Sequence, residues 1–563
     1  MKPAHEKYIP FVPLKMARRA WPDRELKAPP VWCSVDLRDG NQALIDPMNV
    51  REKLELFHTL VDIGVKEIEV GFPSASETEY EFIRTLIEGG HIPDDVTIQV
   101  LVQAREHLIR RTFEAIDGAK HVIFHFYNST STLQRKVVFH TDVEGVKKIA
   151  VDAARLIREL SQPALDAGMD LRYEYSPESF MGTEMDAAVE ICQAVIEALG
   201  ATPERKVILN LPTTVENCMP NYFADEIEYF ISRLPGRDRA IISLHPHNDR
   251  GEGVATAELG LLAGAERVEA TLFGNGERTG NVDMVTLALN LYTQGVDPKL
   301  DFSDINKIRD VYERVTKMKI GERQPYVGEL VFTAFSGSHQ DAINKGTRYM
   351  EESGTEYWEV PYLPIDPADV GRQYEPIIRI NSQSGKGGSA FVMQHSFGFD
   401  LPKAMHPEFG HIVQVETDRV GKELKPDAIY DLFKAHYIDA VKPYQLVQHS
   451  FAEFTDEEGH SHVTFAGTIR HTDTVFQVQG SGNGPIDAFF NAIHGQKMDR
   501  FTFIDYKEHA VKQGSDSQAV AYIHLQDENG RDWFGVGMSH NINLAPLKGI
   551  LSAINRAVSH DGK

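Results

Sequence analysis

Short apolar runs alternate with helix-period stretches from about residue 30 to residue 280. Eight of these runs are predicted strands: Val31–Asp39, Val65–Pro73, Val96–Gln103, His121–Ser129, Leu171–Glu178, Lys206–Thr214, Ala240–Asp249 and Arg267–Glu277. Helices are predicted between them: Val50–Ile63, Glu77–Glu88, Val143–Asp166 and Ala187–Ala198. Eight strand–helix units in about 250 residues predict an α/β fold, a (β/α)8 TIM barrel. A doubly wound open sheet is the alternative, but no GxGxxG opens the first helix.

Polar residues gather at the C-terminal ends of these predicted strands. They are Arg38, Asp39, Gln103, His125, Tyr127, Glu178, Thr213, Thr214, His245, His247, Asn275 and Glu277. In a TIM barrel these strand ends form the active-site face. The pattern therefore favours the barrel and places a site at one end of it.

The rhythm changes after about residue 320. Residues 329–385 are rich in Gly, Pro and Ser, which predicts a connector with little regular structure, and residues 386–440 form a small helical piece. We divide the chain into four parts: an N-terminal extension (1–30), the barrel domain (31–328), connector subdomains (329–441) and a C-terminal domain (442–563).

The C-terminal part contains a repeated pattern. Three strands precede a glycine-rich loop (480–485) and a helix from Ile486; these strands are Tyr444–Gln448, His462–Ile469 and Thr474–Gln479. A second round follows: Phe501–Glu508, Ala519–Gln526, Asp532–Ser539 and the helix Ala545–Ser559. This predicts a separate α+β domain built on a duplicated ββα-type unit.

Composition narrows the class of protein. The 563 residues carry a formal net charge of −24, which disfavours binding to nucleic acid. Three cysteines form no CxxC pair, which indicates a reducing compartment and argues against a structural zinc site. No apolar run reaches about 18 residues, so no membrane span is expected. The basic N-terminus lacks an apolar signal core, and we expect a cytoplasmic protein.

His245 and His247 are the first candidates for chemistry. Residues two apart on a strand point to one face, so the two imidazoles project together. Asp39, at the end of another predicted strand, adds a carboxylate. Three N/O ligands with open positions suit a catalytic divalent cation better than a structural one. The alternative is a pair of histidines that caps a strand.

Arg38 and Glu178 are candidates for catalytic roles. Arg38 can donate hydrogen bonds to an oxygen that becomes anionic. The alternative is a surface turn with a salt bridge, and Asp36 better fits that structural role. Glu178 could be a general acid or base, or part of a salt bridge within the barrel.

Three further motifs have weaker signals. The segment GNGERTGN (274–281) lacks the end of a P-loop, so it more plausibly shapes the site and offers an Asn oxygen to the cation; a flexible loop is the alternative. His339 in SGSHQD (336–341) is a lone histidine, which is usually structural. The loop 480–485 could bind a small zwitterion through backbone groups or be a plain turn.

With these motifs, the chain resembles the α-isopropylmalate synthases of the DRE-TIM metallolyase superfamily. The resemblance is carried by DLRDGNQ (36–42), EYSPESF (174–180), LPTTVE (211–216), HPHND (245–249) and GNGERTGN (274–281). The segments SGSHQDAINKG (336–346), VPYLPIDP (360–367) and NSQSGKGG (381–388) resemble the longer subtype of the family.

The resemblance implies an acyltransferase that condenses acetyl-CoA with 3-methyl-2-oxobutanoate and water, giving 2-isopropylmalate and CoA, the committed step of leucine biosynthesis. It implies a divalent cation (Mg²⁺, Mn²⁺ or Zn²⁺) held by Asp39, His245, His247 and Asn281. The implied substrate pocket consists of His125, Tyr127, Ser176, Asn210, Pro212 and Thr214. The implied catalytic residues are Arg38, Glu178, His339 and Tyr362, with Glu178 and His339 as alternatives for the base.

The resemblance also implies a homodimer, in which the connector of one subunit completes the site of the other. It implies feedback inhibition by L-leucine, bound in the C-terminal domain by Asn483, Gly484, Pro485, Ile486, Tyr506 and Ala510. One alternative is a related synthase for another 2-oxo acid, such as a citramalate or homocitrate synthase, or a lyase. Another is a silent metabolite sensor, which the intact set of catalytic residues disfavours.

Overall fold

The computed structural model describes residues 3–334, 336–374, 388–420, 424–455, 461–494, 498, 500–511 and 517–561. The chain forms two compact units: Met1–Phe332 with Leu363–Tyr374, and Thr333–Tyr362 with Glu375–Lys563. Residues 381–387 of the NSQSGKGG motif lie outside the described residues.

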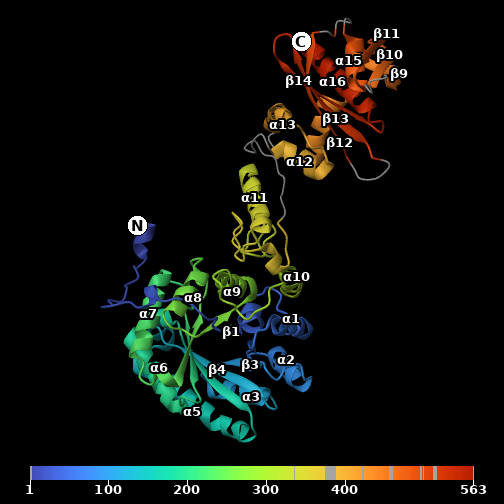
Figure 1. The fold of residues 1–563 in the computed structure, drawn as a ribbon. Coiled ribbons are helices and arrows are strands. Elements are labelled where there is room, and N and C mark those ends of the chain that lie inside the picture. The colour runs from blue at the N-terminus through green and yellow to red at the C-terminus, as the bar shows by residue number, and fades with distance from the viewer. Residues whose placement is uncertain are drawn as a thin grey trace. The chain divides into compact units, whose positions relative to one another are not determined.

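The first unit is a closed barrel of eight parallel strands in chain order, with helices around it (Figure 1). The strands are β1 (Val31–Ser34), β2 (Glu67–Gly71), β3 (Thr97–Gln103), β4 (His121–Ser129), β5 (Asp170–Glu178), β6 (Val207–Pro212), β7 (Ala240–His245) and β8 (Arg267–Ala270). β1 pairs with both β2 and β8, which closes the barrel. The predicted TIM barrel is confirmed.

Helices surround the barrel on its outside (Figure 1). They are α1 (Val50–Ile63), α2 (Glu77–Glu88), α3 (Glu106–Ala115), α5 (Val143–Asp166), α6 (Met185–Leu199), α7 (Pro220–Arg233), α8 (Gly253–Leu262), α9 (Met284–Tyr292) and α10 (Ile305–Thr316), with a single turn α4 (Thr132–Gln134). On α1, Leu56, Phe57 and Leu60 are buried, and Asn49 and Glu52 form a capping box at its start.

Five predicted strands run too far at their C-terminal ends, and β1, β7 and β8 do so by four residues or more. β1 ends at Ser34, and Asp36–Gly40 form a π-helical turn because the Gly40 N–H returns to the Val35 carbonyl at 3.1 Å. β7 ends at His245 and β8 at Ala270. The polar residues at these ends therefore lie in the connections that follow the strands, where the backbone leaves the sheet.

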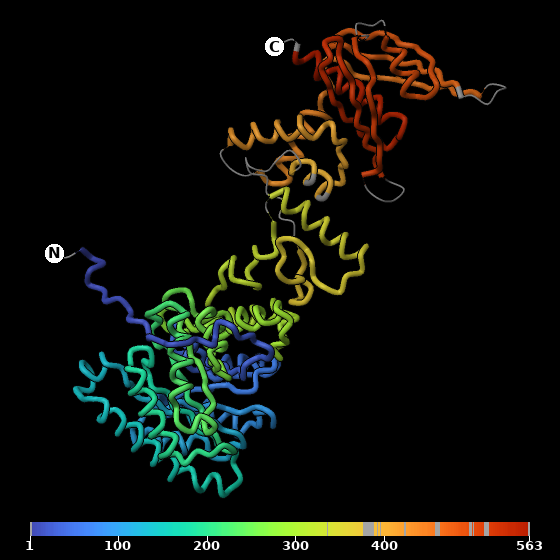
Figure 2. The backbone as a smooth tube through the Cα atoms, turned by 60° about the vertical axis from the view of Figure 1, so that its left-hand side comes forward, coloured from blue at the N-terminus to red at the C-terminus, as the bar shows by residue number. Residues whose placement is uncertain are grey.

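The N-terminal segment runs onto the barrel (Figure 2). Arg19 donates two hydrogen bonds to Asp225 of α7, at 2.7 and 2.8 Å, and the Trp21 indole donates a third at 2.9 Å. These contacts anchor the extension on the barrel's outer surface. Within the described part of the chain, every helix is too short or too polar to cross a bilayer.

The second unit begins with a helix that the sequence did not predict. Residues 329–385 were expected to have little regular structure, but α11 spans Gly337–Ser353. Gln340, Ile343 and Gly346 are buried at a spacing of three residues, so this mostly polar helix packs along a narrow face. The predicted helical piece that follows contains α12 (Gly388–Phe397), α13 (His406–Val420) and α14 (Pro426–Phe433).

The C-terminal domain is α+β, as predicted, and each repeat has three strands and one helix. The first repeat is β9 (Tyr444–Thr455), β10 (Ser461–His471), β11 (Thr474–Gly482) and α15 (Pro485–Ile493); the second is β12 (Phe501–Ala510), β13 (Ala519–Asp527), β14 (Asp532–Ser539) and α16 (Leu544–Asp561). Successive residues of β13 face opposite sides of the sheet. Ile523 packs in a core with α15 and α16, and Tyr522 packs in a core with α12–α14.

Candidate metal centre and barrel cavity

Asp39, His245 and His247 come together at the C-terminal end of the barrel. One ligand atom from each lies within 4.8 Å of the others, and all three side chains are buried. Asp39 Oδ2 is 3.3 Å from His245 Nε2 and 3.8 Å from His247 Nε2. The residues predicted from strand spacing thus form a candidate group for a divalent cation.

Asn281 completes the group from the connection after β8. Its Nδ2 donates to Asp39 Oδ2 at 2.9 Å, and its backbone bridges to His247. Asn281 Oδ1 and His247 Nδ1 are both buried, and neither has a hydrogen-bond partner among the described residues. Buried polar atoms rarely stay unpaired, so this N/O donor set fits a bound cation.

Charges inside the group favour ligation. Burial opposes ionisation of Asp39, but the neighbouring Arg38 charge and the hydrogen bond from His245 hold its pKa well below the usual range. Burial and the charge of His245 lower the pKa of His247 to about 3, which keeps its imidazole neutral. Burial also disfavours charged His245, but hydrogen bonds to Asp39 and Glu269 outweigh it and raise its pKa to about 9. A bound cation would displace that proton.

A cavity of about 330 Å³ adjoins the group. It brings together eleven of the predicted residues: Arg38, Asp39, His125, Tyr127, Ser176, Glu178, Asn210, Pro212, Thr214, His245 and His247. Phe72 and Leu101 also line it, and neither was predicted from the sequence. Both are apolar, which suits a wall that receives an aliphatic group.

The π-helical turn after β1 positions Arg38 and Asp39. Asp36 anchors the turn: it accepts hydrogen bonds from the Ser34 hydroxyl at 2.8 Å and from the Leu272 N–H at 3.0 Å, as expected for a structural carboxylate. Arg38 Nη1 contacts Asp39 Oδ1 at 2.8 Å, and its Nε donates to Glu69. The guanidinium is therefore fixed beside the candidate metal centre.

Glu178 and Thr214 lie on the opposite wall of the cavity. Glu178 accepts a hydrogen bond from the Ser129 hydroxyl. Thr214 has a positive φ of 55°, and its Oγ1 accepts from the Ser179 N–H at 2.8 Å. The hydroxyl hydrogen of Thr214 can then donate to a ligand in the cavity.

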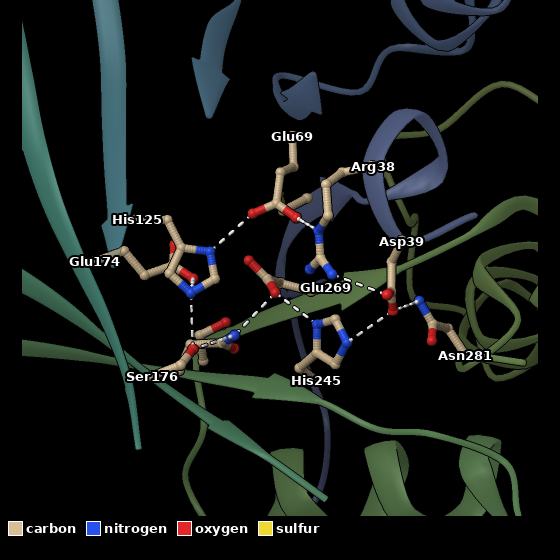
Figure 3. Close-up of polar contacts among 12 residues, drawn as sticks. Arg38, Asp39, Glu69, His125, Glu174, Ser176, His245, Glu269 and Asn281 are labelled. Carbon is tan, nitrogen blue, oxygen red and sulfur yellow. Dashed lines mark hydrogen bonds and ion pairs between the residues drawn. The ribbon is translucent and has the colours of Figure 1, made fainter. Parts of the chain in front are cut away.

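A buried ring of polar residues forms the floor of the site (Figure 3). It closes through eight side chains, each in contact with the next: Glu269, His245, Asp39, Arg38, Glu69, His125, Ser176 and Asn210. Gln99 crosses the ring, because its Nε2 lies 2.7 Å from both Glu69 Oε2 and Glu269 Oε1. We call these eight residues the buried ring.

Sequence reasoning missed Glu69 and Glu269 of this ring, and also Gln99 and Arg267, which contact them. The signal was present, because Glu67 and Glu69 alternate along β2, and Arg267 and Glu269 along β8. Charged residues two apart in short strands of a closed barrel face its interior, which is filled by side chains. They need partners there, and Arg267 Nε contacts Glu67 at 2.7 Å.

The remaining predicted residues lie in the second unit. His339 is on α11, and its ring stacks on that of Tyr362 with a centroid distance of 4.0 Å. In the C-terminal domain, Asn483–Ile486 lie at the start of α15, and Tyr506 and Ala510 lie on β12. In the described part of the domain, no hydrogen bond or ring contact joins these two sets.

Comparisons with known proteins match each part of the chain. The HMGL-like family matches residues 29–312. The alpha-isopropylmalate synthase post-catalytic domain-like family matches residues 329–394, and the LeuA allosteric (dimerisation) domain matches residues 423–558. Among solved structures, the hydroxymethylglutaryl-CoA lyase from Pseudomonas aeruginosa is 18% identical, with 53% of this chain and 97% of that chain covered and a TM-score of 0.43.

Curated relatives match over the full length. The 2-isopropylmalate synthase of Clostridium acetobutylicum is 53% identical over 98% of this chain and 99% of its own. That of Brucella suis is 53% identical over 99% of both chains, and that of Mesorhizobium japonicum is 52% identical over 100% of both.

The barrel and its N/O ligand group thus define an enzyme of the HMGL-like class. With its post-catalytic and LeuA domains, the chain belongs to the 2-isopropylmalate synthase family. The predicted family and the predicted enzyme class, an acyltransferase, are confirmed.

Proposed function

We propose that the barrel cavity condenses acetyl-CoA with 3-methyl-2-oxobutanoate and water, and releases 2-isopropylmalate and CoA. The observation that carries this proposal is one cavity lined by the candidate metal ligands, a fixed guanidinium and a carboxylate, in a chain of this family. Asp39, His245, His247 and Asn281 would hold the divalent cation. When bound, the cation supplies Lewis-acid polarisation of the ketone.

The chain's own residues supply the rest of the chemistry. Arg38 presents positive charge to the ketone oxygen as that oxygen becomes anionic. Thr214 donates its free hydroxyl hydrogen to the substrate carboxylate. A base must take a proton from the acetyl methyl group, and Glu178 is the candidate that already lines the cavity. His339, stacked on Tyr362, is the alternative, contributed by a second subunit.

The charges of the cavity favour a branched monocarboxylate over a dicarboxylate. Both arginines in the lining are already paired: Arg38 with Asp39 and Glu69, and Arg278 with Asp249 at 2.7 Å. A second substrate carboxylate would have to break one of these pairs. Phe72 and Leu101 instead offer apolar contact to an isopropyl group.

We further propose that leucine binds the C-terminal domain and inhibits the barrel. The support is the match to a LeuA allosteric (dimerisation) domain, together with a glycine-rich turn at the start of α15 that exposes backbone groups. Asn483–Ile486, Tyr506 and Ala510 remain the proposed leucine-binding positions.

The test is an assay of CoA release from acetyl-CoA across a panel of 2-oxo acids, with and without leucine. We expect preference for 3-methyl-2-oxobutanoate and a decrease in rate with leucine. Preference for pyruvate or 2-oxoglutarate would contradict the proposed substrate. Asp39→Ala and His247→Ala should abolish turnover while circular dichroism stays unchanged.

A further inference from the structure

Glu269 lies beneath the candidate metal centre, on β8, and is fully buried. Its Oε2 is 2.7 Å from His245 Nδ1, the ring nitrogen that faces away from Asp39. A carboxylate can only accept a hydrogen bond, so Nδ1 carries the hydrogen. That arrangement leaves Nε2 of His245, the nitrogen nearest to Asp39, as the one available to a cation.

Four donors hold the Glu269 carboxylate in place. Besides His245, it accepts hydrogen bonds from Gln99 Nε2 at 2.7 Å, Asn210 Nδ2 at 2.9 Å and Arg267 Nη1 at 3.1 Å. The donors come from β3, β6, β7 and β8, so rotation of the carboxylate would break contacts with four strands. The orientation of His245 is thus set by the barrel as a whole.

Asn210 extends this support to the substrate side. The same Nδ2 that donates to Glu269 lies 3.1 Å from Ser176 Oγ, and both Asn210 and Ser176 line the cavity. Glu269 itself does not line it. It therefore reaches the cation's ligand and the cavity floor at once, without touching a substrate.

We propose that Glu269 is a positioning residue, which fixes the metal-binding tautomer and orientation of His245 and couples this ligand to the cavity floor through Asn210. The inference rests on the proposed metal site. Loss of such a carboxylate behind a ligating histidine typically weakens metal affinity or activity 10–100-fold.

Glu67 offers a matched control. It is a buried glutamate on β2, and it accepts from Arg267 Nε at 2.7 Å and from Arg172 Nη1 at 2.8 Å. It shares the Arg267 cluster with Glu269 but has no contact with a candidate metal ligand in the described structure. If a substitution weakened Mn²⁺ binding only by disturbing this cluster, substitution of either glutamate would therefore weaken it equally.

The experiment is titration of the metal-stripped full chain with Mn²⁺, followed by electron paramagnetic resonance of free Mn²⁺. Glu269→Gln should bind Mn²⁺ roughly 10–100-fold more weakly than the wild type. Glu67→Gln should bind it like the wild type. Glu269→Asp, which keeps the charge but shortens the reach to His245, should fall between them and serves if Glu269→Gln does not fold.

Unchanged affinity in Glu269→Gln, or equal weakening in Glu67→Gln, would overturn the inference, since either result indicates a role in stability alone. Asp39→Ala separates this failure from failure of the metal site. If the wild type and Asp39→Ala bind Mn²⁺ alike, the proposed site is wrong. If only Asp39→Ala loses binding while Glu269→Gln keeps it, only the role of Glu269 is wrong.

Discussion

Arg38 illustrates how a single side chain is fixed for catalysis. Its Nε donates to Glu69 and its Nη1 to Asp39, so the planar guanidinium is held at two edges. A lysine ammonium at this place cannot maintain both contacts with the same geometry. The residue's value lies in this fixed orientation as much as in its charge.

We therefore expect Arg38→Lys to lower kcat by about 10²–10³-fold, the usual cost of losing one oriented donor to a developing oxyanion. Arg278→Lys is the control, because Arg278 also lines the cavity but its side chain is 42% exposed and pairs with Asp249. Steady-state CoA release with both variants checks this. Equal losses would contradict an orientation-specific role for Arg38.

Glu226 of α7 gives a prediction about pH. Burial, and then the like charge of Asp225, raise its pKa well above the usual range, and its Oε2 has no hydrogen-bond partner in the part of the chain that the structure describes. Above the carboxyl's ordinary pKa of about 4.3, the folded state binds more protons than the unfolded state, so this group's contribution to stability decreases as pH rises.

Glu226→Gln removes that dependence. Its thermal midpoint should exceed that of the wild type by more at pH 8 than at pH 5.5, because the wild type loses stability as this carboxyl ionises. Thermal unfolding at both pH values measures the difference. A gap that stays constant or narrows toward pH 8 would show that Glu226 is ionised in the folded protein.

The candidate metal ligands Asp39, His245 and His247 could be predicted from the sequence because polar residues that follow apolar strands are conspicuous. Ser176, Asn210 and Pro212 of the cavity lining were instead implied by the resemblance to the family. Glu69 and Glu269 were missed although they alternate with Glu67 and Arg267, because a charged residue inside a strand suggests a solvent-facing side. Only the closed barrel shows that this side is the interior. Their partners come from strands up to 200 residues away, as Glu67 and Arg267 illustrate.

At the scale of elements, the ends of several helices were predictable, but the ends of the strands were less so. α1, α2 and α5 begin and end where the apolar period predicts. β1 stops five residues early, at Ser34 rather than Asp39. The hydrogen bond from the Gly40 N–H to the Val35 carbonyl folds the backbone into a turn there. α11 escaped prediction because only a narrow side of it is buried.

The contact between β14 and α16 has no room for a side chain at Gly537. A Cβ there would lie 2.0 Å from the Ala545 carbonyl oxygen and 2.5 Å from the Gly549 nitrogen, both backbone atoms. We expect Gly537→Ala to destabilise the C-terminal domain by about 1–3 kcal/mol. It should also weaken the leucine response while basal CoA release persists.

Gly484→Ala is the matched control for folding. Its backbone is extended, with φ −167°, and a Cβ there meets nothing within 4 Å. Limited proteolysis and thermal unfolding should find this variant as stable as the wild type. If Gly537→Ala resists proteolysis equally well, the packing argument is wrong.

At the scale of the whole molecule, His339 and Tyr362 lie in a different compact unit from the barrel, and the proposal that a second subunit contributes them can be tested with two variants. We expect Asp39→Ala and His339→Ala each to be inactive as a homodimer. Mixed by co-expression, they should regain about one quarter of wild-type activity, since half the dimers are heterodimers with one intact site each.

Separate affinity tags on the two variants allow the heterodimer to be purified and assayed for CoA release. The control is a mixture of Asp39→Ala with His247→Ala, whose defects fall in the same barrel group. This mixture should stay inactive. If both mixtures are inactive, each chain builds its site alone.

The pairing of β1 with β8 has a consequence for biosynthesis. Asp39 and Asn281 are 242 residues apart, and they meet only when the last strand joins the first. At ribosomal rates of about 5–20 residues per second, Asp39 is made about ten to fifty seconds before Asn281. The complete candidate group can therefore form only after β8 has been made and has joined β1. A cation held by all four residues would bind late in the folding of the barrel.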